Sequence, residues 1–331
     1  MQSKATITAL GTYTPERVVD NDYFESIVDT SDEWIVQRTG IRERRFAGEQ
    51  EFTSDLCVAA TEQLMRQYNQ SVDDVDMIIV STTTPDYAFP SVASRVQARL
   101  GIPHTGAIDL NATCAGFVYG LCMANALITA GMNRKVLVIG AETLTKATDY
   151  KDRTSCILFG DGAGAALVEY TEDAPGFLST YIGPTQGEGG IHLYRTRHSA
   201  QMDGQPLTDH GLMVQNGREV YRWAVKTVPS GMHAVTQQAG LPLSDVDWFI
   251  PHSANARMIE TICEKSGFPL EKTLMSLEKY GNTSSATIPL ALEIGIREEK
   301  VQEGDTLLLY GFGGGLVHAG VLMKWAPGQK D

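Results

Sequence analysis

The sequence repeats itself at a fixed distance of 171 residues, and this repeat constrains the fold more than any single motif. Three pairs of positions share that offset and the local pattern around them: Asp76 with Asp247, Gly140 with Gly311, and Asn111 with Asn282. Residues 100–103 match 267–269 at a smaller offset, as a compensated insertion would produce. The period is domain-sized, which excludes a solenoid. We therefore expect two copies of one α/β unit, residues 1–172 and 173–331.

Each copy mixes buried strands with helices. Residues 77–80 and 136–139 are apolar without polar alternation, which is typical of strands covered on both faces of a sheet. Helices are predicted over 54–68 and 91–100. Residues 114–130 form a helix that is apolar on nearly every side, so we expect it to be buried. The predicted architecture is an α/β fold in layers, with a helix between two sheets.

Composition and charge exclude several classes of protein. A net charge of −13 disfavours binding to nucleic acid and to anionic membranes, and any acidic partner would need a local basic patch. No run of eighteen apolar residues is present, so no membrane span is expected. The apolar part of residues 1–11 is too short for a secretory signal and is predicted as a strand ending in a turn at Gly11. We therefore expect a cytoplasmic protein.

The five cysteines are odd in number and contain no CxxC pair, so a disulfide framework is not expected. No cluster of cysteine and histidine has the spacing of metal ligands, so no metal site is expected either. The question that remains is whether one of these cysteines is reactive.

Cys114 is the cysteine best placed to act as a nucleophile. It follows the strand-like residues 106–110 and opens the buried helix, where unpaired backbone N–H groups and the positive helix end favour a thiolate. Its neighbours Ala112, Ala115 and Gly116 are small, so a substrate carbonyl could approach closely. A buried cysteine of the core is the alternative that position alone leaves open. The other four cysteines are interpreted as packing residues.

His252 and Asn282 are candidates on the second copy. His252 ends a predicted strand over 247–251 and is followed by small residues, which suits proton transfer or donation to a developing charge at the rim of a sheet. Asn282 lies in a turn signal before the apolar residues 288–294. A structural histidine and a turn asparagine are the alternatives. Asn282 matches Asn111, three residues before Cys114, so a pseudo-twofold axis would bring both loops to one centre.

Two glycine-rich segments have different interpretations. Residues 311–315 end a strand, and their backbone N–H groups could converge on an anion as an oxyanion hole requires. A phosphate loop is excluded because no GK[ST] follows. Residues 159–164 run into a predicted strand at 165–168, whereas a dinucleotide-binding motif needs a helix there. Binding of NAD is therefore not expected.

With a cysteine, a histidine and an asparagine in this order, the sequence resembles the thiolase superfamily and, within it, the β-ketoacyl-[acyl-carrier-protein] synthase III family. Specific motifs carry the resemblance over almost the whole chain: TSDEWI at 30–35, RTGI at 38–41, AGF at 115–117, FGDGAG at 159–164, GNTS at 281–284 and FGGG at 312–315. The resemblance implies a thiolase-like, duplicated, five-layered αβαβα sandwich.

The resemblance also implies a two-step reaction. Cys114 takes the acyl group of a short-chain acyl-CoA, and malonyl-acyl carrier protein then enters. His252 and Asn282 bind its thioester carbonyl during decarboxylative condensation to β-ketoacyl-acyl carrier protein, CoA and CO2. The N–H groups of Cys114 and Gly314 hold the oxyanion, and Phe312 orients the malonyl carboxylate. No metal or redox cofactor is implied.

Further residues take binding roles by the same resemblance. Those that match positions of the CoA tunnel are Trp34, Arg38, Thr39, Arg153, Gly217 and Asn255, with Trp34 and Arg153 on either side of the adenine. Those that match the docking face for the acyl carrier protein are Arg257, Arg222 and Lys265, although Arg222 and Lys265 could equally be solvated surface residues. Phe89 matches a residue that a homodimer partner inserts into the acyl pocket.

Three departures from the family pattern affect the shape of the tunnel: Ser253 where glutamine is common, Thr113 where alanine is frequent, and Ala256 where a bulkier aliphatic residue is usual. None removes a reacting group. The alternatives are a related thiolase-fold acyltransferase of another pathway and a non-catalytic acyl-CoA-binding paralogue. The preferred starter chain is not predicted, because acyl groups that differ by one methylene differ by only about 1–3 kcal/mol in a pocket.

Overall fold

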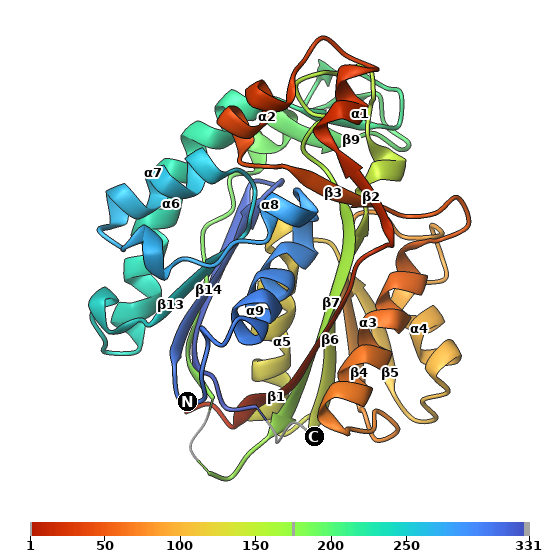
Figure 1. Cartoon of the computed structure of the whole chain (residues 1–331). Coiled ribbons are helices and arrows are strands. Elements are labelled where there is room, and N and C mark those ends of the chain that lie inside the picture. Colours follow the sequence, from red (N-terminus) through yellow and green to blue (C-terminus); the bar gives the residue numbers. More distant parts are fainter. Residues whose placement is uncertain (1, 174–175, 328–331) are drawn as a thin grey trace.

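The computed structural model describes residues 2–173 and 176–327, and within these ranges two β-sheets form its framework (Figure 1). The first sheet has the order β1–β7–β6–β4–β5, with strands Ala5–Tyr13, Asp161–Tyr170, Lys135–Thr143, Met77–Ser81 and Gly106–Leu110. The second has the order β8–β15–β14–β13, with strands Phe177–Ile182, Val317–Lys324, Thr306–Gly313 and Trp248–Pro251.

The second sheet repeats the first. In each sheet the first two strand pairs are antiparallel and the third is parallel. Beside β13, where a copy of β5 would lie, the described residues form only an isolated bridge between Phe249 and Thr273. The lost strand lies after the segment in which the sequence repeat slips. The predicted duplication is therefore confirmed in the topology.

Helices cover and separate the two sheets. On the outer faces lie α3 (Thr53–Tyr68) and α4 (Val92–Leu100) against the first sheet, and α6 (Gly217–Gln238) against the second with α7 (Ala256–Ser266) beside it. Between the sheets lie α5 (Gly116–Thr129) and α9 (Thr287–Arg297), which contact strands of both sheets (Figure 1). The layers are α, β, α, β, α, so the predicted five-layered sandwich is confirmed.

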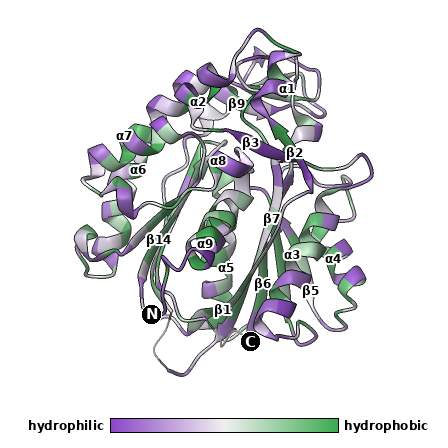
Figure 2. Ribbon diagram, viewed as in Figure 1, coloured by the Kyte–Doolittle hydropathy of each residue, from purple (hydrophilic) through white to green (hydrophobic). Residues whose placement is uncertain are grey.

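The two central helices are apolar because both of their faces meet a sheet (Figure 2). Phe117 and Leu121 of α5 share one hydrophobic cluster with Ile288 and Leu292 of α9, and all four are fully buried or nearly so. Burying a side chain of this size stabilises the fold by about 1.5–3 kcal/mol. This contribution explains why residues 114–130 show no polar face.

One local prediction was wrong. The first strand does not end in a turn at Gly11 but continues to Tyr13. A Cβ atom at Gly11 would lie 2.4 Å from the carbonyl oxygen of Ala60 and from the backbone nitrogen of Leu64. The glycine is therefore needed because α3 packs directly on the strand.

The remaining elements gather at one end of the sandwich (Figure 1). They include the hairpin of β2 (Arg17–Asp20) and β3 (Glu43–Phe46), and the helices α1 (Asn21–Glu25), α2 (Asp32–Thr39) and α8 (Leu277–Tyr280). Short strands pair as β9 (Leu193–Arg195) with β12 (Met213–Gln215), and β10 (Gln201–Met202) with β11 (Gln205–Pro206). Within the described ranges, no helix is both long and apolar enough to cross a membrane.

Candidate active site

Two equivalent turns meet at the centre of the molecule. The 3-10 turns η1 (Thr113–Ala115) and η6 (Ser284–Ala286) precede the two central helices and contact each other. Thr113 has φ +46° and Ser284 has φ +50°, and these residues are 171 positions apart. A non-glycine residue with positive φ is uncommon. Its occurrence in both copies shows that each copy enters its central helix through the same tight turn, and these turns present Cys114 from one copy and Asn282 from the other.

The turns open into one cavity of about 1340 Å³. Cys114, His252, Asn282 and Phe312 all line it, and it extends to Trp34 on α2. The structure thus brings the three predicted reacting residues together, although they come from three distant parts of the chain.

Burial dominates the electrostatics of Cys114. It raises the pKa of the Cys114 thiol to about 12, while the backbone N–H groups of Cys114 and Gly314 and the hydroxyl of Ser284 act in the opposite direction as donors to the thiolate. Cys114 lies in the 3-10 turn, and α5 begins two residues later. The backbone N–H groups thus favour a thiolate in the predicted direction, but desolvation acts more strongly and the net pKa is raised.

The glycine-rich segment approaches the nucleophile closely. A Cβ atom at Gly313 would lie 2.8 Å from Cβ and 3.0 Å from Sγ of Cys114. The Thr113 hydroxyl donates a 2.8 Å hydrogen bond to the carbonyl oxygen of Gly314, which ties the two segments together. The N–H groups of Cys114 and Gly314 both favour the thiolate, so both lie near the sulfur, where the oxyanion of an attacked carbonyl would form.

His252 is held as a neutral ring. It is 2% exposed, and burial lowers its pKa to about 3. Its Nδ1 lies 2.8 Å from the Thr287 hydroxyl oxygen, and its ring meets Phe312 edge-on with centroids 5.3 Å apart. These contacts fix the ring on two sides. The single proton of the Thr287 hydroxyl can serve either Nδ1 or the Ser284 carbonyl oxygen, which lies 2.9 Å away, and when it goes to Nδ1, the Nε2–H of His252 is left to donate to a substrate.

Asn282 presents its amide nitrogen. Its Oδ1 already accepts a 2.9 Å hydrogen bond from the backbone N–H of Ser284, so Nδ2 is the free end. Its backbone is bound on both sides, since its N–H donates to Leu158 (2.8 Å) and its carbonyl accepts from Gly160 (3.1 Å). The glycine-rich motif at 159–164 therefore supports the Asn282 loop and continues as β7.

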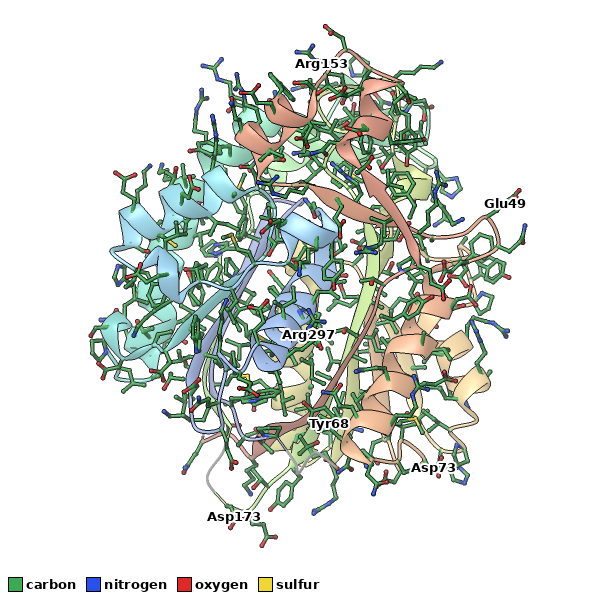
Figure 3. All side chains as sticks on the ribbon, viewed as in Figure 1. Glu49, Tyr68, Asp73, Arg153, Asp173 and Arg297 are labelled. Atoms are coloured by element: carbon green, nitrogen blue, oxygen red, sulfur yellow. The ribbon has the colours of Figure 1, made fainter. Side chains whose placement is uncertain are left out.

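The predicted CoA residues surround the outer part of the cavity. Trp34, Arg38, Thr39, Gly217 and Asn255 line it. Arg153 lies over the Trp34 ring at 5.2 Å and donates to the backbone oxygen of Asp29 at 2.8 Å. Figure 3 labels Arg153 at the end of the molecule that carries α1 and α2. This separation is too small for an aromatic base between the two side chains, so binding of adenine there requires Arg153 to move outward.

Two of these residues already use their polar groups internally. The Thr39 hydroxyl donates to the carbonyl of Ile35 (2.7 Å) and accepts from the N–H of Ile41 (3.0 Å). The Asn255 amide nitrogen donates to the carbonyl of Arg38 (2.9 Å) and so joins α7 to α2. Both residues shape the tunnel wall, and neither offers a free polar group.

The predicted docking residues are exposed on neighbouring helices. Arg222 lies on α6, and Arg257 and Lys265 lie on α7. Arg222 is already paired with Glu219 at 2.9 Å, which reduces its availability. The sequence did not single out three other arginines that line the cavity itself: Arg195, Arg197 and Arg218.

Phe89 is 85% exposed and does not line the cavity of its own chain. It belongs to a loop that follows Thr82, Thr83 and Thr84, which do line the cavity.

The residues that link the three reacting side chains to one another were not predicted from the sequence. Ser284 contacts Cys114 and Glu142, and Thr287 contacts His252. For Ser284 a signal existed, because it lies opposite Thr113 in the repeat. Glu142 lies near the end of the buried apolar strand β6, and an acidic residue at such a place is itself a signal. Among the described residues, no three of His, Cys, Asp and Glu are grouped as a metal site requires.

The chain is similar to known proteins along nearly its whole length. The profile of 3-oxoacyl-[acyl-carrier-protein] synthase III matches residues 108–185, and the profile of the C-terminal part of that enzyme matches 236–325. The chain is 62% identical over 330 residues to β-ketoacyl-[acyl-carrier-protein] synthase III 2 of Halalkalibacterium halodurans, and the match covers 99% of each. It is 58% identical to the protein of the same name from Bacillus subtilis, covering 98% of this chain and 99% of that one. The crystal structure of the synthase III from Thermus thermophilus has a TM-score of 0.93 at 43% identity, covering 98% of this chain and 99% of that one.

Proposed function

The chain belongs to the 3-oxoacyl-[acyl-carrier-protein] synthase III family of condensing acyltransferases, and we propose that it initiates fatty acid synthesis through Cys114, His252 and Asn282. The observation that carries the residue assignment is that all three line one cavity, with two backbone N–H groups near the sulfur. A protein that only binds acyl-CoA would have no need for such a nucleophile.

In the first half-reaction the Cys114 sulfur attacks the carbonyl carbon of a short-chain acyl-CoA. The oxyanion is held by the N–H groups of Cys114 and Gly314, and CoA leaves when its C–S bond breaks. Trp34 and Arg38 bind the nucleotide end of CoA at the mouth of the cavity. The acyl group stays on Cys114 as a thioester, so neither a metal nor a redox cofactor takes part.

In the second half-reaction malonyl-acyl carrier protein enters the same cavity. Nε2 of His252 and Nδ2 of Asn282 donate to its thioester carbonyl, and this stabilises the enolate formed when CO2 leaves. The enolate carbon attacks the acyl-cysteine and releases Cys114. Phe312, packed against His252, excludes water from the malonyl carboxylate. Arg257, with Arg222 and Lys265, offers the basic face for the carrier protein despite the overall negative charge.

We further assign the enzyme to the cytoplasm and expect a homodimer, in which Phe89 of each chain enters the acyl pocket of the other. The exposure of Phe89 and of Tyr87 (57%) supports this arrangement. In analytical ultracentrifugation, Phe89→Asp should shift the protein toward monomer, whereas Met132→Asp, which changes an exposed residue on another part of the surface, should not.

The choice of acceptor tests the proposed reaction. The protein is incubated with acetyl-CoA or a branched acyl-CoA and with malonyl-acyl carrier protein or malonyl-CoA, and the products are identified by mass spectrometry. Formation of β-ketoacyl-acyl carrier protein and CO2 is expected. Condensation with malonyl-CoA alone would instead indicate a related acyltransferase of another pathway.

A further inference from the structure

A buried carboxyl group lies next to the site without an assigned task. Glu142, near the end of β6, is 0% exposed. None of the ion pairs among the described residues includes it. Burying a charge without a cation is costly unless hydrogen bonds replace its hydration. A carboxyl group kept in such a place therefore calls for an explanation.

Three consecutive threonines surround Glu142 with donors. Its Oε2 accepts hydrogen bonds from the hydroxyls of Thr82 (3.2 Å), Thr83 (3.0 Å) and Thr84 (2.7 Å), and from the backbone N–H of Thr83 (3.0 Å). The Thr82 hydroxyl accepts from the N–H of Thr84, and the Thr84 hydroxyl accepts from the N–H of Thr143. Because these oxygens already accept backbone protons, their own hydrogens are directed to Glu142. This cluster is arranged to hold a carboxylate.

Ser284 connects this carboxyl group to the nucleophile. The turn that carries Ser284 packs against both β6, which carries Glu142, and the turn that carries Cys114, and the Ser284 hydroxyl stabilises the charged form of each of these two side chains. The backbone N–H of Ser284 binds Asn282, and its carbonyl accepts from Thr287, which contacts His252. Ser284 is 3% exposed and is held with positive φ, so its hydroxyl has few other places to go.

We propose that Glu142 is the proton acceptor for the Cys114 thiol, acting through the hydroxyl of Ser284. The S–H bond of Cys114 and the O–H bond of Ser284 break, while one new O–H bond forms on Ser284 and one on Glu142. The electron pair left on sulfur forms the bond to the acyl carbon. When the C–S bond to CoA breaks, the proton returns from Glu142 through Ser284 to the departing CoA sulfur. The proposal rests on the acyl-accepting role of Cys114.

Electrostatics support this direction of transfer. A thiolate beside an ionised Glu142 would place two negative charges in one buried site, and transfer of the proton between them keeps the total charge constant. Burial raises the pKa of Glu142 to about 7, so the carboxylate that accepts the proton forms near neutral pH. This places the group in the range in which general bases act efficiently.

Few other groups around the relay titrate in this range. His252 is neutral above its lowered pKa of about 3. On α3, burial raises the pKa of Cys57 well above its usual value, and its surroundings include Glu142, Asp86, Asp109 and Arg99. Asp109 is the nearby acid with a raised pKa, and the N–H groups of Ala93 and Val92 oppose that rise.

The experiment measures the alkylation of Cys114 by iodoacetamide between pH 5 and 10, followed by peptide mass spectrometry. In the unchanged protein the rate should rise with pH around a midpoint near 7, as Glu142 ionises. In Glu142→Gln and Ser284→Ala this rise in rate near pH 7 should vanish. The alkylation rate at pH 8 should fall by about a hundredfold, which is the lower end of the rate enhancement that a positioned general base supplies. Ser284→Thr keeps the hydroxyl in a backbone conformation that Thr113 already adopts, and it should restore the rise.

Asp161→Asn is the matched control. Asp161 is also 0% exposed, and its described hydrogen bonds go to Ala47 and Thr145 instead of the site. This variant should keep the midpoint near 7. An unchanged profile in Ser284→Ala, or in a folded Glu142→Gln, would overturn the relay. If the protein without substitutions also formed no acyl adduct with acyl-CoA, the proposed function would fail as well. If that adduct forms normally and the pH profiles of the variants equal that of the protein without substitutions, only the relay is refuted.

Discussion

Replacement of His252 by alanine should separate the two half-reactions. His252 is fixed by Thr287 on one side and by Phe312 on another, so its Nε2 is already oriented toward the cavity. Removal of one preorganised donor to a developing oxyanion typically costs about 10²–10³ in rate. Condensation with malonyl-acyl carrier protein should therefore fall by that factor, while transfer of the acyl group to Cys114 should change by less than about tenfold, since other donors hold that oxyanion.

Thr287 supplies a second arm to this prediction. Thr287→Val removes the hydroxyl that contacts His252 and donates to the Ser284 carbonyl. Loss of the contact with the ring is worth about 1 kcal/mol and should slow condensation by about five- to tenfold. In the His252→Ala background the same change should have no further effect, because Thr287 acts through the ring. Each half-reaction is measured separately, by intact mass for acylation and by CO2 release for condensation.

A buried histidine outside the cavity provides the control. His318 is also 2% exposed and pairs with the Tyr310 hydroxyl at 2.7 Å. His318→Gln should lower stability without separating the half-reactions. The reasoning is refuted if His252→Ala slows both half-reactions equally, or if Thr287→Val remains additive to it. Condensation should also show no step from His252 between pH 5 and 9, because its lowered pKa leaves the ring neutral there.

Three further outcomes follow from the geometry. Trp34→Ala should weaken CoA binding by about 1–3 kcal/mol in calorimetry, as loss of a stacking surface does, and Trp34→Phe should lose less. Gly313→Ala should abolish acylation, checked by intact mass, because its Cβ would lie 2.8 Å from that of Cys114. Asp161 has its pKa raised by burial to about 6 from 3.8, so the folded chain binds this proton more tightly and the stabilisation present below about pH 4 is lost as the pH rises through 6. In Asp161→Asn, thermal unfolding should show a weaker fall in Tm over that interval.

The fold was predictable because its signals are periodic. The 171-residue repeat indicated two copies, and the apolar character of residues 114–130 indicated a helix between sheets. The same repeat placed Asn282 opposite Asn111 and so brought two turns to one centre. These signals are visible in the sequence because an element that is buried on both faces consists almost entirely of apolar residues.

The electrostatics of the site were not predictable in the same way. The high pKa of Cys114 results from desolvation by segments far away in sequence, including the strand that ends at Gly313. Glu142 reaches the site only because β4 and β6 are neighbours, which places the threonines after β4 around it. Such contacts depend on sheet order and close packing, which no local pattern encodes. The boundary between residues 172 and 173 remains a proposal, lying between β7 and β8.

The central claim is that Cys114 carries the acyl group, and intact mass spectrometry tests it most directly. After incubation with acetyl-CoA or a branched acyl-CoA, the chain should gain the mass of one acyl group on Cys114. Malonyl-acyl carrier protein should then remove it as β-ketoacyl-acyl carrier protein. Cys114→Ala should bind CoA without forming the adduct. An adduct that persists in Cys114→Ala, or one that malonyl-acyl carrier protein does not discharge, would contradict the account.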